Sequence, residues 1–243
     1  MSNKVILIHG LGLSTSMWDV FVPAIESWGF DVLTYNLPGH GGDAPVKRSH
    51  DLQLYVEQAL AQMDKIGWDC AHLVGFSLGG MINRKLALLE PHRTASLSIW
   101  NSPHDRGEHQ QAAVEDRARN SRQYGVDSTL EAALDRWLTA EATDDLRNQV
   151  RSWRRSCDPG SYAEAAWVLA NGVPELVNAE PTKQVPTQVI TCENDVGSTP
   201  DMARKIAMAL KAETVEIIPG LKHLGLLQRP DLFLDPLKKF LSS

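Results

Sequence analysis

One short stretch constrains the fold more than any other part of the chain. Residues 71–76 form an apolar run typical of a strand, Ser77 follows at once between Gly75 and Gly79, and helical apolar spacing begins after Gly79. A Gly-x-Ser-x-Gly turn between a strand and a helix is a nucleophile elbow, whose strained backbone lifts the serine hydroxyl above the strand end. The flanking positions must be glycine because a side chain there would collide with the neighbouring strand or helix. We therefore expect Ser77 at the carboxyl edge of a sheet.

Strand and helix patterns alternate along most of the chain. Between the first two predicted strands, an amphipathic helix is indicated by i, i+3, i+4, i+7 spacing of Trp18, Phe21, Val22 and Ile25. The predicted strands are Val5–Ile8, Phe30–Leu37, Ala71–Phe76, Ala95–Trp100, Val185–Cys192 and Thr214–Ile218. The unbroken apolar character of the first run is typical of a parallel strand buried on both faces. The alternation predicts an α/β fold with a mostly parallel, doubly wound sheet of about six strands.

The alternation is interrupted in the middle of the chain. Residues 103–183 show helical periodicity and no convincing strand. We expect this segment to form a helical cap over the carboxyl edge of the sheet, inserted after the fourth strand. Residues 1–102 and 184–243 would then form the core domain.

Composition and charge narrow the class of partner. The 243 residues are 43% hydrophobic and 22% charged, which is an ordinary globular composition, and the formal net charge is −6. Without a basic patch, nucleic acid and anionic membranes are not expected as partners. No signal peptide or transmembrane run is visible, so the expected location is cytoplasmic. The three cysteines lack metal-binding spacing and are expected to be reduced thiols: Cys70, Cys157 and Cys192.

A serine nucleophile needs a general base, and the base needs an orienting acid. In a parallel sheet both must lie at the carboxyl ends of strands. His223, in the loop after the last predicted strand, is the candidate base. Of the carboxylates after the fifth strand, Glu193 is nearest the strand and is expected to pin the loop. Asp201 fits the first turn of a helix, where the helix dipole favours a negative charge, which leaves Asp195 as the candidate acid.

The other histidines are given other roles. His9 and His40 lie in glycine-containing loops after the first two strands and are candidate site-lining residues. His72 begins a strand and is expected to be structural. The remaining four lie in polar stretches and are expected to be solvated: His50, His92, His104 and His109.

A tetrahedral oxyanion needs two fixed N–H donors. The candidates are the backbone N–H of Leu78, which starts the helix of the elbow, and that of Leu11, in the loop after the first strand. Residues 10–12, Gly-Leu-Gly, also partly fit a dinucleotide-binding fingerprint, but Thr15 stands where its third glycine is required. The oxyanion interpretation is therefore preferred.

Together these motifs resemble the α/β-hydrolase family. The resemblance covers nearly the whole chain and rests on His9-Gly10, Leu37-Pro-Gly-His-Gly41, Gly75-Phe-Ser-Leu-Gly-Gly80, Glu193-Asn-Asp195 with Thr199-Pro200, and Gly220-Leu-Lys-His223. Within the family the chain is most similar to 3-oxoadipate enol-lactonases and related small esterases, through Arg136-Trp137-Leu138 and Asp158-Pro-Gly-Ser-Tyr162. It departs from the family in three ways: the antiparallel hairpin before the first parallel strand is missing, Asn36 replaces the usual aspartate, and the loop that carries Asp195 is one residue longer than usual.

The resemblance implies a serine hydrolase that acts on a small carboxylic ester or lactone and needs no metal or organic cofactor. Ser77 would form the acyl-enzyme, His223 would move the proton and Asp195 would hold the imidazole. If the substrate is a dicarboxylate-like lactone, the cap should supply a cation. Arg136 is the first choice, followed by Arg154 and Arg155.

Three tryptophans receive expectations as well. Trp137 is a candidate substrate-binding residue, Trp18 lines the site floor or packs in the core, and Trp153 packs in the cap. Alternative activities on the same three residues stay open: a carbon–carbon hydrolase of ring-cleavage products, a cofactor-free perhydrolase, a thioesterase or an acyltransferase. A ligand-binding receptor is the alternative from another class, and homo-oligomerisation is left open.

Overall fold

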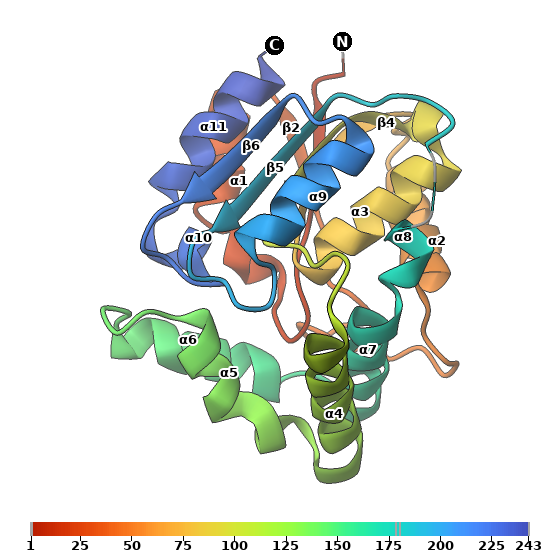
Figure 1. Ribbon diagram of the computed structural model, residues 1–243. Helices are drawn as coiled ribbons and strands as arrows, with labels where there is room; N and C mark the ends of the chain where they lie inside the picture. Colours follow the sequence, from red (N-terminus) through yellow and green to blue (C-terminus); the bar gives the residue numbers. More distant parts are fainter. Residues whose placement is uncertain (1, 178, 180, 243) are drawn as a thin grey trace.

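The computed structural model describes residues 2–177, 179 and 181–242. Met1 and Ser243, the outer limits of the predicted core segments, and positions 178 and 180 of the predicted cap lie outside the described residues. The described residues form a six-stranded, all-parallel sheet in the order β2-β1-β3-β4-β5-β6, which confirms the predicted fold class (Figure 1). The strands are β1 Lys4–Ile8, β2 Asp31–Thr34, β3 Ala71–Phe76, β4 Thr94–Trp100, β5 Thr187–Cys192 and β6 Thr214–Ile218.

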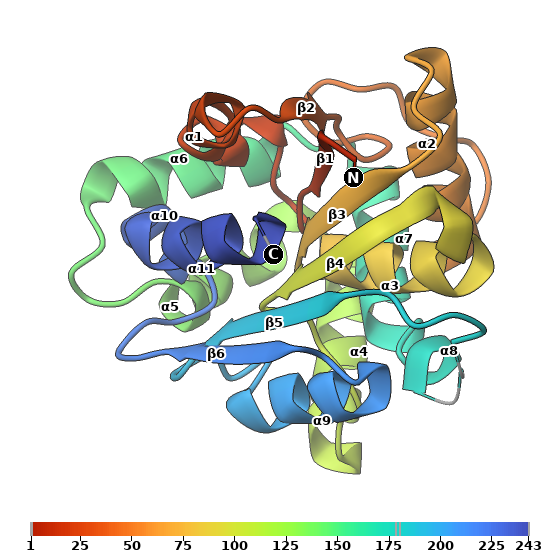
Figure 2. The same ribbon diagram turned by 90° about the horizontal axis from the view of Figure 1, so that it is seen from above.

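Helices cover both faces of the sheet, as the crossover connections of parallel strands require (Figure 2). One face carries α1 (Phe21–Ser27) and α11 (Asp231–Leu241), which contact each other. The other face carries three helices: α2 (Leu52–Lys65), α3 (Leu78–Leu89) and α9 (Pro200–Leu210).

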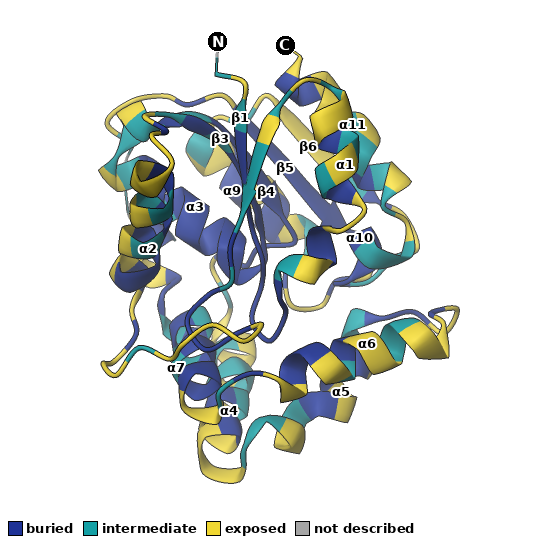
Figure 3. Ribbon diagram, turned by 180° about the vertical axis from the view of Figure 1, so that it is seen from behind, coloured by how far each residue is buried: buried dark blue, intermediate teal, exposed yellow. Residues whose placement is uncertain are grey.

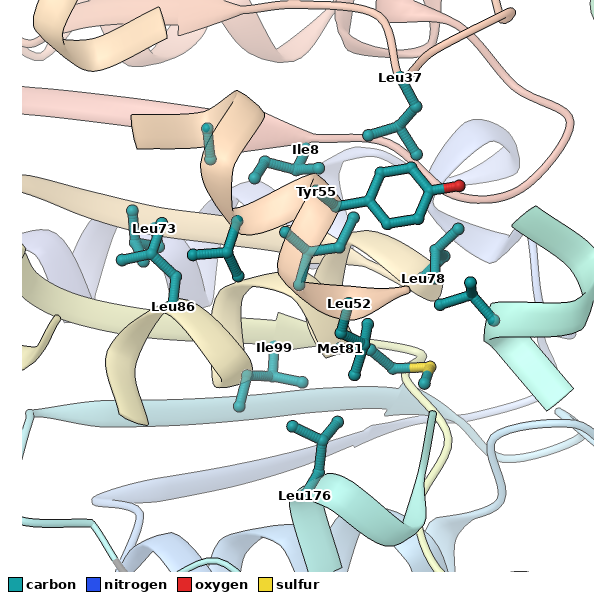
Figure 4. Close-up of a cluster of buried hydrophobic side chains, with 14 of the residues drawn as sticks. Ile8, Leu37, Leu52, Tyr55, Leu73, Leu78, Met81, Leu86, Ile99 and Leu176 are labelled. Atoms are coloured by element: carbon teal, nitrogen blue, oxygen red, sulfur yellow. The ribbon is translucent and has the colours of Figure 1, made fainter. Parts of the chain in front are cut away.

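The first strand shows how two separate cores hold the sheet. Ile6 and Ile8 belong to the core beneath α2 and α3, whereas Val5 and Leu7 belong to the core beneath α1 and α11. All four side chains are fully buried, and burying each contributes about 1.5–3 kcal/mol. Figure 4 shows the first of these cores around Ile8, and Figure 3 shows the buried inner strands of the sheet between partly exposed helices. The uninterrupted apolar run of this strand is thereby explained.

The predicted helix at Trp18 is broken in the structure. A short 3₁₀ turn, η1 (Thr15–Trp18), ends at this residue, and α1 begins only at Phe21. The indole of Trp18 is fully buried, with its ring centroid 5.5 Å from that of Phe21 and 5.8 Å from that of Trp100. Trp18 therefore packs in the core, which is one of the two roles predicted for it; the other, that it lines the site floor and binds substrate, is wrong.

The second strand is shorter than predicted. It ends at Thr34, and the chain leaves the sheet before Leu37, whose backbone N–H donates to Nε2 of His9 at 3.0 Å. A side chain has thus taken the place of a neighbouring strand as the partner of this amide.

A block of helices separates β4 from β5 and lies below the carboxyl edge of the sheet in Figure 1. Within the described part of residues 101–186 there is no strand. We keep the name cap for this block. Its elements are α4 Glu108–Tyr124, η3 Val126–Thr129, α5 Leu130–Trp137, α6 Asp144–Arg155, α7 Pro159–Asn171 and α8 Pro174–Val177.

A buried arginine joins the two ends of the cap to the core. The guanidinium of Arg84, on α3, donates to the backbone oxygen of Pro103 at 3.2 Å and to Nδ1 of His104 at 3.1 Å, where the cap begins. It also reaches the backbone oxygen of Leu176, near the end of the cap, at 3.5 Å. Arg84 is only 2% exposed, so these acceptors replace the water that the charge has lost.

Two of the histidines expected to be solvated are buried. His104 packs against Arg84, and Nδ1 of His50 lies 2.8 Å from the hydroxyl of Tyr55. Their polar flanks gave no sign of these tertiary partners. His92 and His109 are exposed, as expected. His72 is structural as predicted, with one ring nitrogen 2.7 Å from Oγ of Ser96.

No helix among the described residues is long and apolar enough to cross a membrane. All three cysteines are free thiols, as predicted.

Candidate active site

Ser77 sits in a strained turn between β3 and α3. Its backbone angles are φ 54° and ψ −111°, in a region that residues other than glycine rarely adopt and that costs about 1–3 kcal/mol. The neighbours hold this conformation: the Ser77 N–H donates to the backbone oxygen of Trp100 at 2.8 Å, and Oγ of Ser102 donates to the Ser77 carbonyl at 2.9 Å. The turn therefore has the form of the predicted elbow.

The flanking glycines are required by close backbone contacts. A Cβ on Gly75 would lie 2.4 Å from the carbonyl oxygen of Gly79, and a Cβ on Gly79 would lie 2.1 Å from that of Ile8. Both distances are far shorter than any real carbon contact. The predicted collision with the neighbouring strand and helix is confirmed.

His223 and Asp195 form a short, buried pair. Nδ1 of His223 lies 2.6 Å from Oδ2 of Asp195, and both residues lie in loops after β6 and β5 at the carboxyl edge of the sheet. Oδ1 of Asp195 accepts hydrogen bonds from the backbone N–H groups of Gly197 at 2.8 Å and Ser198 at 2.9 Å. These contacts fix the carboxylate, and the carboxylate fixes the imidazole.

The other two acid candidates lie elsewhere, as predicted. Oε2 of Glu193 accepts a hydrogen bond from the backbone N–H of Gly220 at 2.8 Å and so joins the two loops. Asp201 lies in the first turn of α9, where its carboxylate is exposed and pairs with Lys205 at 3.2 Å.

Asn101 is a functional candidate that sequence reasoning missed. It follows β4 directly, is fully buried and has a φ of 43°, a left-handed conformation that asparagine adopts more easily than most residues. Its Nδ2 donates to Oδ2 of Asp195 at 2.8 Å, the same oxygen that faces His223. A sequence signal existed: an asparagine directly after a buried strand, at the edge where the site is expected.

A cavity of about 330 Å³ lies between the sheet edge and the cap. On the sheet side it is lined by Leu11, Ser77, Asp195 and His223, and on the cap side by Arg106, Arg117, Arg136, Trp137, Arg154 and Tyr162, among others. The indole of Trp137 stands over the candidate base, with ring centroids 5.8 Å apart. The backbone N–H of Leu224 also donates to the Trp137 carbonyl at 2.9 Å, so the base loop and α5 are held together.

The two candidate oxyanion donors flank Ser77. Leu78 is the first residue of α3, and the N–H groups of a first helical turn have no partner within the helix. Leu11 lines the cavity, and its loop lies against the elbow, since a Cβ on Gly10 would be 3.1 Å from Cβ of Ser77. Among the described residues, neither amide N–H donates a hydrogen bond.

His9 and His40 do not line the cavity, so the prediction for them is wrong. Both lie within the loops after β1 and β2 and are fully buried. Burial lowers the pKa of His9 to about 3 and that of His40 to about 4. The neutral His9 ring accepts from Leu37 at Nε2, so its Nδ1 donates to the Gly10 carbonyl at 2.8 Å. His9 thus supports the loop that carries Leu11.

The predicted cations divide into two sets. Arg136 and Arg154 line the cavity, whereas Arg155 is exposed and pairs with Asp127 at 2.9 Å. Sequence reasoning missed two further arginines of the cavity wall, Arg106 and Arg117.

Trp153 has the packing role expected for it. It is buried and belongs to the same hydrophobic cluster as Val150 of α6 and residues of α1 and α11. No group of three or more metal-ligating His, Cys, Asp or Glu side chains is found among the described residues.

Comparison with known proteins gives the family. A family model described as alpha/beta hydrolase family matches residues 5–235. The (E)-2-((N-methylformamido)methylene)succinate hydrolase of Acinetobacter baylyi is 25% identical over 94% of this chain and 86% of its own length. Another relative, 3-oxoadipate enol-lactonase 2 of the same organism, is 24% identical over 94% of this chain and 85% of its own length.

Solved structures agree on the fold. The enol-lactonase from Burkholderia xenovorans has a TM-score of 0.87 at 24% identity, covering 100% of this chain and 92% of that one. An esterase from Exiguobacterium antarcticum has a TM-score of 0.89 at 15% identity, covering 99% and 92%. The chain belongs to the α/β-hydrolase family, and the predicted resemblance to enol-lactonase-like members is confirmed.

Proposed function

We propose that the protein is a serine hydrolase that cleaves a small carboxylic ester or lactone through an acyl-enzyme on Ser77. One observation carries the proposal. The 2.6 Å pair of His223 and Asp195 opens onto the same cavity as the strained Ser77. A nucleophile, a base and an orienting acid are the three groups that acyl transfer to water requires.

The orientation of His223 assigns the roles of its two nitrogens. Nδ1 is engaged by Asp195, so Nε2 is the nitrogen left for the proton of Ser77. In the proposed reaction, Ser77 Oγ attacks the carbonyl carbon while Nε2 takes its proton, and the imidazolium then gives this proton to the departing alkoxide or enolate. Water activated by His223 releases the acid and restores Ser77.

The developing oxyanion would be held by the N–H groups of Leu11 and Leu78. Their lack of protein acceptors among the described residues supports this role. One such donor contributes about 2.7–4 kcal/mol to lowering the barrier.

The names of the relatives support ester or lactone cleavage without deciding the bond. One relative is named as an enol-lactonase and another as the hydrolase of a substituted succinate. The chain would share the chemistry of acyl transfer with both. The alternative enzymes named under Sequence analysis would act on other bonds or acyl acceptors with the same three residues, and the alternative receptor would bind a ligand without breaking a bond.

A substrate panel tests the proposal. It contains 4-nitrophenyl acetate and butyrate, a small lactone, a ring-cleavage dienone and an acyl thioester, each with wild-type protein and with Ser77→Ala. We expect the esters and the lactone to have the highest kcat/KM and Ser77→Ala to abolish turnover. A dienone or thioester preferred over every ester would replace the proposal by one of its alternatives, and no turnover of any compound would favour a receptor.

A further inference from the structure

Eight of the nine arginines of the cap fall into two groups with different partners; the ninth, Arg147, donates to the Thr139 carbonyl at 2.7 Å. Four of them form ion pairs with carboxylates of the cap itself: Arg119, Arg122, Arg151 and Arg155. Four others line the cavity above Ser77, and none of these has a carboxylate partner among the described residues: Arg106, Arg117, Arg136 and Arg154. Asp195 is the one acidic residue on the described cavity wall, and it is already bonded to His223.

The cavity therefore holds positive charge that the protein leaves unbalanced. The pKa values of Arg106 and Arg136 are both lowered to about 10, chiefly by burial and in part by the nearby charge of Arg117. Both groups still carry their protons at neutral pH. Like charges gathered in a partly buried wall without a counter-ion destabilise the folded protein. A bound anion would remove this cost.

The four guanidiniums differ in how many donors they have free. In Arg106, Nη1 donates to the Ala170 carbonyl at 3.2 Å and Nη2 donates to the Leu169 carbonyl at 3.1 Å. The guanidinium of Arg154 donates to the Val126 carbonyl at 3.1 Å and lies 4.8 Å from the ring centroid of Tyr162. Both groups are held by protein acceptors, although Nε of Arg106 is buried and has no partner among the described residues.

Arg117 and Arg136 keep their donors for a ligand. The guanidinium of Arg117 donates to no acceptor among the described residues, and Arg136 uses only Nη1, which donates to the Ala132 carbonyl at 2.8 Å. They stand on α4 and α5, and both face the cavity. A free guanidinium edge binds a carboxylate through two parallel hydrogen bonds.

We propose that Arg117 and Arg136 are specificity-determining residues that each bind one carboxylate, so that the acyl part of the substrate carries two carboxylates beyond the scissile carbonyl. Two carboxylates would pair both guanidiniums that keep free donors, whereas a single carboxylate bound by one of them would leave the other without a counter-ion. This inference deepens the proposed function and rests on it for the identity of the bond that is cleaved.

Binding of product acids tests the inference without turnover. Pentanoate, glutarate and tricarballylate share a five-carbon backbone and carry one, two and three carboxylates. By isothermal titration calorimetry at pH 7, we expect each added carboxylate to lower the Kd at least tenfold. Arg117→Gln and Arg136→Gln should each raise the Kd of tricarballylate at least tenfold. Arg119→Gln, on the same helix as Arg117 but ion-paired on the surface, should change it less than twofold.

Two binding results would overturn the inference. One is a tricarballylate Kd no lower than that of glutarate, which would mean that one carboxylate is enough. The other is an equal loss of affinity in Arg119→Gln and Arg117→Gln, which would reduce the effect to overall charge.

Kinetics separate this inference from the proposed function. The ratio of kcat/KM for the 4-nitrophenyl ester of tricarballylate to that for 4-nitrophenyl pentanoate should exceed tenfold in the wild type and fall towards one in Arg117→Gln and Arg136→Gln. A wild-type ratio near one, with both esters cleaved, would refute the inference and leave the serine hydrolase standing. The predicted binding series without cleavage of either ester would support the anion site and refute the hydrolase.

Discussion

At the scale of single residues, the site depends on how one carboxylate is held. Asp195 accepts four hydrogen bonds, two from backbone N–H groups, one from His223 and one from Asn101. The donors other than His223 fix the position of the Asp195 carboxylate, and the carboxylate in turn fixes the tautomer of the His223 imidazole. Changes at this carboxylate should therefore alter catalysis far more than the packing of the fold.

The first prediction concerns the choice of acid. Asp195→Asn should lower kcat for 4-nitrophenyl butyrate by about 10⁴-fold, because an amide stabilises the wrong imidazole tautomer. Asp201→Asn is the matched control: its carboxylate is exposed and paired with Lys205, so kcat should stay within about twofold. Steady-state kcat values of the two variants test this choice. A larger loss of kcat in Asp201→Asn than in Asp195→Asn would show that Asp201 is the orienting acid.

The second prediction concerns Asn101 as a positioning residue. Asn101→Gly keeps the left-handed backbone but removes the hydrogen bond to Asp195, so kcat/KM should fall about tenfold. The loss should fall on kcat, with KM changed less than twofold, because Asn101 acts through Asp195 and does not line the cavity. A loss of stability with an unchanged kcat would show that Asn101 serves the fold alone.

These residues also show how far sequence reasoning reaches. Asp195 and His223 could be predicted because both lie in loops that follow predicted strands, and the carboxyl ends of parallel strands meet at one edge of the sheet. Asn101 contacts a residue 94 positions away, and nothing in its local pattern names that partner. Arg106 precedes α4 and Arg117 lies in the middle of this polar helix, and in both places the sequence of an arginine facing a cavity looks the same as that of one facing solvent.

At the scale of elements, Arg84 ties both ends of the cap to α3. Its three acceptors belong to segments that are far apart in sequence and meet at this one guanidinium. The position of the cap over Ser77 therefore depends on a contact outside the cavity.

The third prediction tests this joint. Arg84→Met leaves two carbonyls and His104 without their donor, and each lost partner costs about 1–3 kcal/mol. The free energy of unfolding, from urea titration, should fall by about 3 kcal/mol or more. Lys85→Met removes an ion pair with Glu175 at 3.0 Å on the next residue and should cost less than about 1 kcal/mol. Equal losses in the two variants would contradict the role given to Arg84.

At the scale of the whole molecule, three buried neutral histidines link stability to pH. Burial lowers the pKa of His9 to about 3 and those of His40 and His104 to about 4. In the unfolded chain a histidine has a pKa of about 6.5. Between pH 6.5 and 4 the unfolded chain therefore binds protons that the folded chain does not, and stability must fall as the pH falls.

The fourth prediction gives the size of this effect. Three such groups produce a slope approaching about 4 kcal/mol per pH unit near pH 5, measurable by urea unfolding between pH 7 and pH 5. His104→Asn keeps an acceptor for Arg84 but removes one titrating group, so its slope should be about 1.4 kcal/mol per pH unit smaller. His92→Asn, on the surface, should keep the wild-type slope. Identical slopes in all three proteins would contradict the assignment.

The fold as a whole was more predictable than its details. The six strands and their parallel orientation follow from apolar runs and crossover helices, because these patterns are local and repeat along the chain, whereas the order of the strands in the sheet comes from the structure. The burial of His50 and His104 and the core position of Trp18 depend on tertiary partners, Tyr55, Arg84 and Trp100, that no local pattern identifies.

The central claim is that Ser77 is the nucleophile, and one measurement tests it most directly. The protein is treated with a fluorophosphonate probe, digested, and the modified peptide is identified by mass spectrometry. We predict one modification, on Ser77, lost in Ser77→Ala and strongly slowed in His223→Ala. Labelling at another serine, or labelling that survives Ser77→Ala, would contradict the claim.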